Sequence, residues 1–400
     1  MTIAVIIAAW TLAAAAALSC GYLLALTLLS AKQRVSVGLN NILARQLRFD
    51  VIVPAHNEYL LIGRVVASLL DVNWPREFFR VVVVADNCTD NTAVLARAAG
   101  AHVVERRHER LRGKGYALEC GIRFSQVSKW ADAVVVVDAD SEVSENLLSA
   151  CAVRIADGAH AIQVHYGVRQ MQTSWRTRLM SIALAAFHRA RSRARERLNV
   201  SSGIRGNGWC VTHALLRRVP YRAFSLAEDI EFGIQLGLDG YRVHYADEAH
   251  VDADMVSDSQ VARTQRRRWE HGRFALVRQK TFKLICAALR QRSMVCLDLA
   301  VDLLVLPLSY IALNVIVLLA VAIFLQYWEP SESAADWLLR TAYVCGLCVL
   351  LYVLRGWQLS GTGIRGLIDL ARAPFFVVWK VASMFRSREP LEWVRTKRRA

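Results

Sequence analysis

Three features of common protein classes are missing from this chain of 400 residues. The one GxGxxG sequence, at Gly361–Gly366, follows a long apolar run and no predicted strand, which excludes the usual dinucleotide-binding fingerprint, and no internal repeat or low-complexity segment occurs. The nine cysteines are scattered, and the CxxC pair Cys345 and Cys348 lies within an apolar run, where we interpret both as helix-packing residues. Neither a disulfide framework nor a zinc site is therefore indicated, which suits a reducing cytoplasm.

Charged residues are also absent from two long apolar runs near the ends of the chain. Residues 1–31 and 303–328 carry none, and residues 337–354 contain only Arg340. About 20 apolar residues are enough to cross a bilayer as a helix. We therefore predict an N-terminal transmembrane anchor at 1–31 and two further spans near the C-terminus.

The first apolar run could instead be a secretory signal peptide. No basic residue precedes it, whereas Lys32 and Arg34 follow it, so we favour an uncleaved anchor. These basic residues place the domain that follows in the cytoplasm. Two more spans return the chain to the same side, and we expect a C-terminal membrane region over 295–400 with an interfacial helix near 365–386 and a basic tail.

The net charge of +16 comes from 50 basic and 34 acidic residues. Nucleic-acid binding is one interpretation of such an excess. In a chain with membrane spans, anionic lipid headgroups and phosphorylated substrates are the favoured partners, and we predict no nucleic-acid partner. Residues 176–197 are rich in arginine, which predicts either a solvated basic helix or a helix that rests on anionic headgroups and lines the acceptor entrance.

Short apolar runs alternate with helical patterns between the two ends. The run 80–85 is rich in valine, as are strands buried on both faces of a parallel sheet. This alternation predicts an α/β domain over 48–281 with a Rossmann-like, mostly parallel sheet. The predicted strands are 49–53, 80–85, 101–104 and 133–137, and the predicted helices are 61–70, 92–99 and 116–126.

Polar residues follow three of these strands. His56–Glu58, Asp86 and Asp138–Asp140 each come directly after an apolar run. Ligands of open α/β sheets bind outside the carboxyl ends of the strands, so these loops should converge on one edge. The Asp86 carboxylate can accept a hydrogen bond from a base N–H, and Glu58 can similarly hold ribose hydroxyls.

Asp138 and Asp140 form a DxD sequence after the apolar run 133–137. Two carboxylates held this close repel one another unless a cation compensates. A hard divalent ion supplies that charge and also bridges phosphates, so we favour a metal site over the alternative of a capped turn. His250 is a further candidate metal or phosphate ligand, although a lone histidine is more often structural.

Glu228 and Asp229 open an apolar helical pattern. A carboxylate at this place is often only a helix cap. The alternative is a general base that removes the proton from an acceptor hydroxyl, a role that contributes about 10²- to 10⁴-fold to a rate. We assign Asp229 as the base and Glu228 as its support.

Gln265, Arg268 and Trp269 lie within one helical turn. The Arg268 guanidinium can clamp a pyrophosphate in two-point fashion, and the Trp269 indole offers a flat face to a sugar. The alternative is a charged, solvated helix. Lys114 is a further phosphate candidate because its flanking glycines permit close backbone approach. We place Trp209 beside an acceptor, although the glycines before it could form only a turn.

This ordered set resembles the membrane-bound family 2 glycosyltransferases of GT-A fold, the group that contains cellulose, chitin and hyaluronan synthases. The motifs extend over residues 48 to about 275, so together with the apolar ends the resemblance covers most of the chain. The matching sequences are Val51–Glu58, Asp86–Asp90, Arg112–Gly115, Asp138–Asp140, Glu228–Asp229 and the QxxRW-type Gln265–Trp269.

The resemblance implies an inverting transfer from a UDP-α-sugar, with Mg²⁺ or Mn²⁺ at Asp140. Asp86 would contact uracil, Asp138 the nucleoside and Asp229 the acceptor hydroxyl. The diphosphate and the acceptor end would be held by Gln265, Arg268 and Trp269. Further expected nucleotide contacts are Pro54, Ala55, His56, Glu58 and Lys114.

The favoured function is a bacterial inner-membrane β-glycosyltransferase that adds one sugar or a few to a lipid-linked or membrane-proximal saccharide acceptor, in exopolysaccharide or glycolipid synthesis. A first alternative is a processive polysaccharide synthase that works as a homo-oligomer or with a partner channel, because three spans are few for one copy to enclose a polymer. A second alternative is an inactive membrane scaffold or nucleotide-sugar sensor. The presence of Asp140, Asp229 and Trp269 argues against inactivity.

Overall fold

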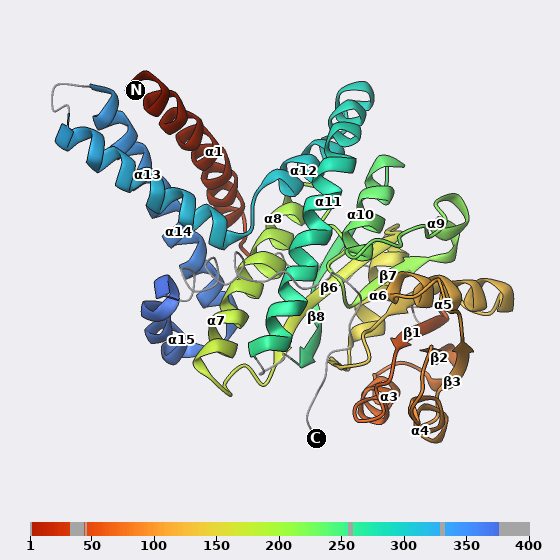
Figure 1. The fold of residues 1–400 in the computed structure, drawn as a ribbon. Helices are drawn as coiled ribbons and strands as arrows, with labels where there is room; N and C mark the ends of the chain where they lie inside the picture. Colours follow the sequence, from red (N-terminus) through yellow and green to blue (C-terminus); the bar gives the residue numbers. More distant parts are fainter. Residues whose placement is uncertain (1, 33–43, 45, 255–258, 329–332, 376–400) are drawn as a thin grey trace. The chain divides into compact units, whose positions relative to one another are not determined.

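The computed structural model divides into two compact units (Figure 1). The sheet unit comprises Lys32–Gln170, Arg195–Leu303 and Pro390–Ala400, and the helical unit comprises Met1–Ala31, Met171–Ala194 and Leu304–Glu389. The residues that the structure describes are 2–32, 44, 46–254, 259–328 and 333–375. Only the backbone is described for helical residues 2–6, 259–266 and 333. The predicted basic tail lies outside the described residues.

A mixed sheet forms the centre of the sheet unit, and its eight described strands follow the order β3-β2-β1-β4-β7-β6-β8-β5. The first four strands along the chain are parallel neighbours, so their carboxyl ends lie at one edge. The strands are β1 (Phe49–Ala55), β2 (Phe79–Asp86), β3 (His102–Arg106), β4 (Ala133–Val136), β5 (Ser141–Val143), β6 (Ala161–Arg169), β7 (Trp209–Thr212) and β8 (His244–Asp254).

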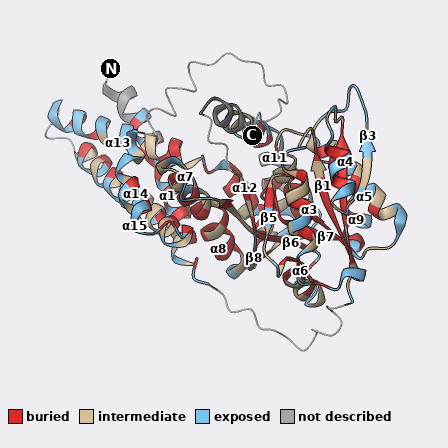
Figure 2. Ribbon diagram, turned by 90° about the horizontal axis from the view of Figure 1, so that it is seen from below, coloured by how far each residue is buried: buried red, intermediate tan, exposed pale blue. Residues whose placement is uncertain are grey.

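Side chains of the parallel strands alternate between two hydrophobic cores. Val51 and Val53 of β1 join one core with α3, α4 and α6, whereas Ile52 joins the other with α5, α9 and α10. β1, β2 and β4 are therefore buried on both faces, as their valine-rich sequences predict, and Figure 2 shows them in the buried colour, whereas the edge strand β3 is exposed to half-buried. The helices of this unit are α3 (Ile62–Leu70), η1 (Arg76–Phe78), α4 (Thr92–Ala98), α5 (Lys114–Ser128), α6 (Leu147–Ala156), α9 (His213–Arg218), α10 (Glu228–Leu238), α11 (Ser259–Gln291) and α12 (Met294–Leu304).

The second half of the sheet departs from a purely parallel arrangement. β7 runs antiparallel to β4 and β6, and β5 runs antiparallel to β8. β6 and β8 are parallel, with a register shift between Val164 and His165. Among the described strands, four of the seven pairings are parallel, so the predicted α/β fold is confirmed as a mixed sheet. β5 and β7 have three and four residues, too few to give a readable sequence pattern.

The helical unit contains the apolar runs found in the sequence. Three helices of the described chain are long and apolar enough to cross a membrane, at Ile7–Leu28, Leu308–Trp328 and Ala334–Ser360. The third helix extends beyond the predicted end at residue 354 and includes the charged Arg355. The Arg355 Nε is satisfied within the helical unit, because it donates a 2.8 Å hydrogen bond to Ser30 Oγ. The helices are α1 (Thr2–Leu28), α7 (Trp175–Leu184), the π-helix η2 (Ala185–Ala190), α8 (Arg191–Arg197, which continues into the sheet unit), α13 (Leu308–Trp328), α14 (Ser333–Ser360), α15 (Gly363–Asp369) and η3 (Leu370–Arg372). The predicted interfacial helix begins as α15 and η3, and its part beyond residue 375 lies outside the described residues.

The arginine-rich segment is not a solvated helix. Arg191 is only 2% exposed, its Nε donates a 2.9 Å hydrogen bond to Tyr352 Oη, and its guanidinium lies over the Phe187 ring. Arg178 Nε forms a 2.6 Å ion pair with Asp369. The solvated alternative is wrong for these residues, because aromatic and carboxylate partners inside the helical unit hold the guanidinium groups.

Candidate active site

The carboxyl ends of β1 and β2 form the first wall of the site. Pro54 and Ala55 end β1 and lie in register with the last part of β2. His56 follows β1, and its Nδ1 lies 2.7 Å from the carbonyl oxygen of Asp86. Two loops that are distant in sequence are thereby joined at one edge of the sheet, as the strand pattern predicts.

Asp86 is a buried carboxylate at the end of β2. Its Oδ1 accepts a 2.5 Å hydrogen bond from Arg106 Nη1 and a 3.0 Å hydrogen bond from Asn87 Nδ2. Glu58 precedes α3, and its backbone N–H donates to Thr92 Oγ1 at 2.8 Å. The structure brings these residues to the edge expected for a nucleotide, and their contacts with a nucleotide remain predictions.

Lys114 stands at the centre of the site, as the first residue of α5. Its Nζ lies 2.6 Å from Asp138 Oδ1 and 3.6 Å from Glu228 Oε1, and it donates a 2.8 Å hydrogen bond to the carbonyl oxygen of Gly206. The flanking glycine is required sterically, since a Cβ on Gly115 would lie 2.3 Å from the Ala223 carbonyl oxygen. One ammonium group thus joins the DxD loop to the start of α10.

Asp138 and Asp140 follow β4 in a loop that is fixed from two sides. The Asp138 N–H donates to Asn207 Oδ1 at 3.0 Å, and Asp140 Oδ1 accepts a 3.2 Å hydrogen bond from Ser141 Oγ. The Asp254 N–H donates to the Asp140 carbonyl oxygen at 3.1 Å. Burial raises the pKa of Asp138 to about 6, with Lys114 opposing the rise and Asp140 adding to it.

Glu228 and Asp229 are the first two residues of α10. The preceding Ala227 is the cap and makes no side-chain capping hydrogen bond, so neither acid is the N-cap of this helix. Burial raises the pKa of both carboxyl groups above the usual range, and Lys114 opposes the rise in each. Asp229 Oδ2 lies 3.5 Å from where a Cβ on Gly206 would stand, so this acid faces the same loop that Lys114 binds.

The pKa of Lys114 reflects this surplus of acids. Burial alone would lower it, but the charges of Asp138, Glu228 and Asp229 outweigh burial and raise the pKa. The ammonium therefore stays protonated at neutral pH. A carboxyl group with a raised pKa in a cleft is suited to proton abstraction near neutral pH.

The basic and aromatic segment lies on α11. α11 approaches the start of α10 closely, because a Cβ on Gly272 would lie 3.0 Å from the Ala227 Cβ. The Arg268 charge acts on the carboxyl group of Glu228 and lowers its pKa, against the larger effect of burial. Trp269 is 38% exposed, which leaves an indole surface open to a ligand. The Gln265 side chain lies outside the described residues.

Of the two remaining predicted site residues, Trp209 is buried and His250 is about half exposed. Trp209 is 2% exposed and its ring stacks with Tyr221 in the core, so this position does not support the predicted acceptor contact. The glycines before it form turns, which was the alternative interpretation. His250 is about half exposed, with Nε2 3.7 Å from Asp252 Oδ2. Within the described residues, no three His, Cys, Asp or Glu side chains are already gathered into a metal-binding group.

The loop 203–208 is the part of the site that the sequence did not reveal. Asn207 holds the DxD loop at both ends, since its Oδ1 accepts from the Asp138 N–H and its Nδ2 donates to Ser141 Oγ at 2.7 Å. Buried Gln163 on β6 accepts from the Arg205 N–H at 2.9 Å and donates to the Asn207 carbonyl oxygen at 2.6 Å. Gly203, Gly206 and Gly208 all have positive φ. Three glycines in six residues are the sequence signal for this tight loop.

Fold and site together define a class of protein. A mixed α/β sheet whose parallel strands end in a DxD loop, beside a partly buried lysine and an acid pair at a helix start, is the arrangement of a GT-A glycosyltransferase. The chain belongs to the family described as glycosyltransferase like family 2, whose family model matches residues 46–272.

Curated relatives match the same part of the chain. A beta-monoglucosyldiacylglycerol synthase from Synechocystis sp. is 29% identical over 234 residues, which cover 56% of this chain and 47% of the relative. A probable glucomannan 4-beta-mannosyltransferase 15 from Arabidopsis thaliana is 22% identical over 246 residues, which cover 58% of this chain and 45% of the relative. The chain thus spans about half the length of the curated relatives it matches.

A solved structure shares the fold over most of the chain. It is the mannosyltransferase PcManGT from Pyrobaculum calidifontis, in complex with GDP-Man and Mn²⁺. The TM-score is 0.52 at 18% identity, and the match covers 88% of this chain and 99% of that structure. The predicted GT-A fold is therefore confirmed, and three helices able to span a membrane accompany it in the described chain.

Proposed function

We propose that this protein is an inverting membrane glycosyltransferase that moves a sugar from a UDP-sugar to a lipid or other membrane-proximal acceptor. The observation that carries the proposal is the position of Lys114, which contacts Asp138 of the DxD loop and Glu228 beside Asp229. A donor diphosphate and an acceptor hydroxyl are thereby assigned to opposite sides of one partly buried ammonium group.

Asp229 is the proposed general base. It removes the proton from the acceptor hydroxyl, and the resulting oxygen forms a bond to the anomeric carbon as the bond from that carbon to the diphosphate oxygen breaks. The displacement is in line, so the anomeric configuration inverts. Lys114 and Arg268 stabilise the negative charge that develops on the leaving diphosphate. Glu228 supports the base by sharing the charge of Lys114 with Asp138.

Asp138 and Asp140 are the proposed ligands of Mg²⁺ or Mn²⁺, with His250 as a candidate third. Carboxylate oxygens are the ligands that these hard ions prefer, and the raised pKa of Asp138 reflects a buried acid next to a second acid. The bound ion would neutralise charge on the diphosphate. The Mn²⁺ in the complex of the archaeal mannosyltransferase supports a divalent ion in this fold.

The acceptor is proposed to be a membrane lipid or a lipid-linked saccharide. Support comes from the synthase of a glucosyl diacylglycerol among the relatives and from the three candidate spans. The basic residues that follow the first span favour a multi-pass protein of the bacterial inner membrane with its sheet unit in the cytoplasm. The sugar would then be added at the inner surface of that membrane.

A donor panel tests this function. The full chain is purified in detergent with lipid, supplied with UDP-glucose, other UDP-sugars and GDP-mannose, and assayed for nucleotide release and for mass change in extracted lipid. The proposal expects Mg²⁺- or Mn²⁺-dependent release of UDP together with a glycosylated lipid. Activity with GDP-mannose alone would overturn the assigned donor, and long polymer from the isolated protein would favour a processive synthase. The absence of any transfer would contradict the function itself.

A further inference from the structure

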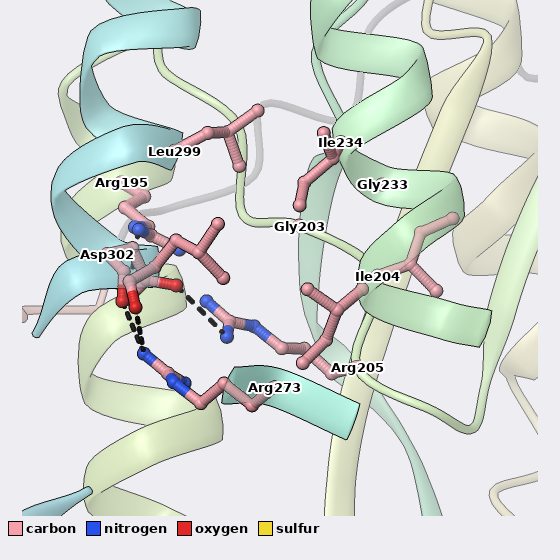
Figure 3. Close-up of a pocket in the computed structure, with 11 residues that line it drawn as sticks. Arg195, Gly203, Ile204, Arg205, Gly233, Ile234, Arg273, Leu299 and Asp302 are labelled. Atoms are coloured by element: carbon pink, nitrogen blue, oxygen red, sulfur yellow. Dashed lines mark hydrogen bonds and ion pairs between the residues drawn. The ribbon is translucent and has the colours of Figure 1, made fainter. Parts of the chain in front are cut away.

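Three buried arginines meet Asp302 beside α10 (Figure 3), and one of them also pairs with Asp298. Arg195 is 0% exposed, and its Nη2 and Nε lie 3.1 Å from Asp302 Oδ1 and Asp298 Oδ2. Arg205 Nη1 lies 3.4 Å from Asp302 Oδ2, and Arg273 Nη2 donates to the Asp302 carbonyl oxygen. All five residues belong to the sheet unit, and Asp302 is the member that contacts all three arginines.

Arg205 connects this cluster to the loop 203–208. Its Nε donates a 3.0 Å hydrogen bond to the Ser202 carbonyl oxygen, so the guanidinium is held between its own loop and Asp302 of α12. The next residue, Gly206, accepts the hydrogen bond from Lys114, and Asn207 beyond it holds the Asp138 N–H. The hydrogen bonds that join this loop to Lys114 and Asp138 thus lie within two residues of Arg205.

The Arg205 side chain has space beside it if the cluster is broken. A cavity of about 20 Å³ lies among Arg195, Arg205 and Arg273 and is bounded by Gly233 and Ile234 of α10, the helix that begins at Glu228 (Figure 3). This volume is enough for about one water molecule. The loop backbone itself packs closely on α10, since a Cβ on Gly233 would lie 3.0 Å from the Ile204 N. The cavity therefore leaves space for the Arg205 side chain, which can change position when its contact with Asp302 is lost.

We propose that Asp302 and Arg205 are positioning residues for sugar transfer, which fix the loop 203–208 so that Lys114, Asp138 and Asp229 hold their relative places. This inference rests on the proposed function. Asp302 lies at the end of α12, and the candidate span α13 begins at Leu308. The anchor of the loop is therefore the helix that leads directly into that span.

Arg205 acts on the proposed site in two ways that substitutions can separate. Its charge affects the pKa of Asp229, and its hydrogen bonds fix the position of the loop 203–208. The groups that act on the Asp229 carboxyl are Lys114 and Arg205, whose charges lower its pKa, and its neighbour Glu228. Arg205→Lys keeps the positive charge but loses the planar two-sided contact with Asp302 and Ser202. Arg205→Met loses both. Asp302→Asn keeps the shape of the side chain and removes the charge that holds the arginines.

The experiment compares these variants with Asp50→Asn in the full-length protein. Asp50 is a fully buried aspartate of the same unit, paired with Arg80 at the other edge of the sheet, and controls for loss of a buried ion pair alone. Two readouts are used: kcat per folded molecule across pH, and hydrogen exchange of the amides in residues 203–208.

We expect Asp302→Asn and Arg205→Lys to lower kcat roughly 10- to 100-fold, because a misplaced group costs about that much, and to speed exchange in the loop. Arg205→Met should in addition move the acid limb of the pH profile to higher pH. Asp50→Asn should do none of these. Unchanged loop exchange or unchanged kcat in Asp302→Asn would overturn the inference, as would an equal loss in Asp50→Asn. If the wild-type protein transfers no sugar, the proposed function fails, and the exchange data still decide whether Asp302 holds the loop.

Discussion

Two clusters of charged side chains lie at opposite ends of the strands of the same sheet. They differ in how completely their carboxylates are paired with cations. At the start of β1, both oxygens of Asp50 are paired with Arg80, at 2.8 Å each, and Ser125 Oγ donates a third hydrogen bond. At the carboxyl ends of the strands, the single ammonium of Lys114 faces Asp138 and Glu228.

This difference indicates that the Asp50 cluster stabilises the fold, whereas the Lys114 cluster serves the reaction. The Asp50 carboxylate is neutralised locally by a two-point partner, so this edge needs no further ion. The site edge has more acids than Lys114 can neutralise, and the pKa values of Asp138, Glu228 and Asp229 are raised. Excess acid in a buried site is what a cationic cofactor and a proton-transfer step require.

The largest expected effect comes from removing the base at the site edge. Asp229→Asn should lower transfer by about 10²- to 10⁴-fold, because the amide cannot accept the hydroxyl proton, while UDP binding is retained. The measurement is single-turnover transfer together with calorimetric titration of UDP. Asp239→Asn, at the exposed C-terminal end of the same helix, is the matched control and should be fully active. Lost UDP binding in Asp229→Asn would show that the acid has another role.

At the opposite edge, Asp50→Asn should act on stability and leave chemistry unchanged. The change leaves Arg80, which is about one-fifth exposed, without its buried counter-charge, and we expect a loss of about 2–4 kcal/mol in the free energy of unfolding. Thermal denaturation and kcat per folded molecule are the two measurements. A large fall in kcat with an intact fold would remove the distinction between the two edges.

A pH profile sharpens the comparison at the site edge. The base must be deprotonated to act, so kcat/KM falls as pH falls, and the raised pKa of Asp229 places this acid limb above the usual carboxylate range. Lys114→Gln removes a charge that lowers the pKa values of Asp138, Glu228 and Asp229, so the limb should move upward by about one pH unit. Lys129→Gln, at the exposed other end of α5, should leave the limb in place. A limb that stays fixed in Lys114→Gln would contradict the electrostatic account.

The last expected effect is a difference in stability between a glycine of the loop 203–208 and a glycine elsewhere in the sheet unit. A Cβ on Gly208 would lie 2.6 Å from Val164 Cγ2 at a positive φ of 68°, whereas Gly158 has φ of 93° and open space around it. Gly158→Ala should therefore cost about 1–2 kcal/mol of stability, and Gly208→Ala about 1–3 kcal/mol more. Chemical denaturation measures both. Equal losses would show that the packing around Gly208 relaxes freely.

The sequence predicted the parallel half of the sheet because its strands are buried on both faces and read as valine-rich runs. Each of these strands is followed by a loop, so Asp86 and Asp138 could be placed at one edge before their contacts were known. The start of α10 and its acids were likewise visible as a helical pattern. These features depend on local sequence.

The parts of the fold and of the site that the sequence did not predict depend on contacts between residues far apart in the chain. Trp209 was misplaced because a tryptophan next to glycines looks exposed, whereas the ring fills the core beside Tyr221. Burial of Arg191 and Arg195 could not be predicted, because arginine is seldom fully buried and its partners lie far away in the sequence. The role of Asn207 could not be predicted, because its two hydrogen bonds to the DxD loop join segments about 70 residues apart.

The most direct test of the acid-rich edge is calorimetric titration of UDP into the wild-type protein and into Asp140→Ala, each with Mn²⁺ and each with a chelator. A divalent ion held by the DxD loop should make UDP bind more tightly to the wild-type protein when Mn²⁺ is present, and this gain should vanish in Asp140→Ala. Equal UDP affinity with and without Mn²⁺ in the wild-type protein would contradict the account, as would a full Mn²⁺ effect in Asp140→Ala.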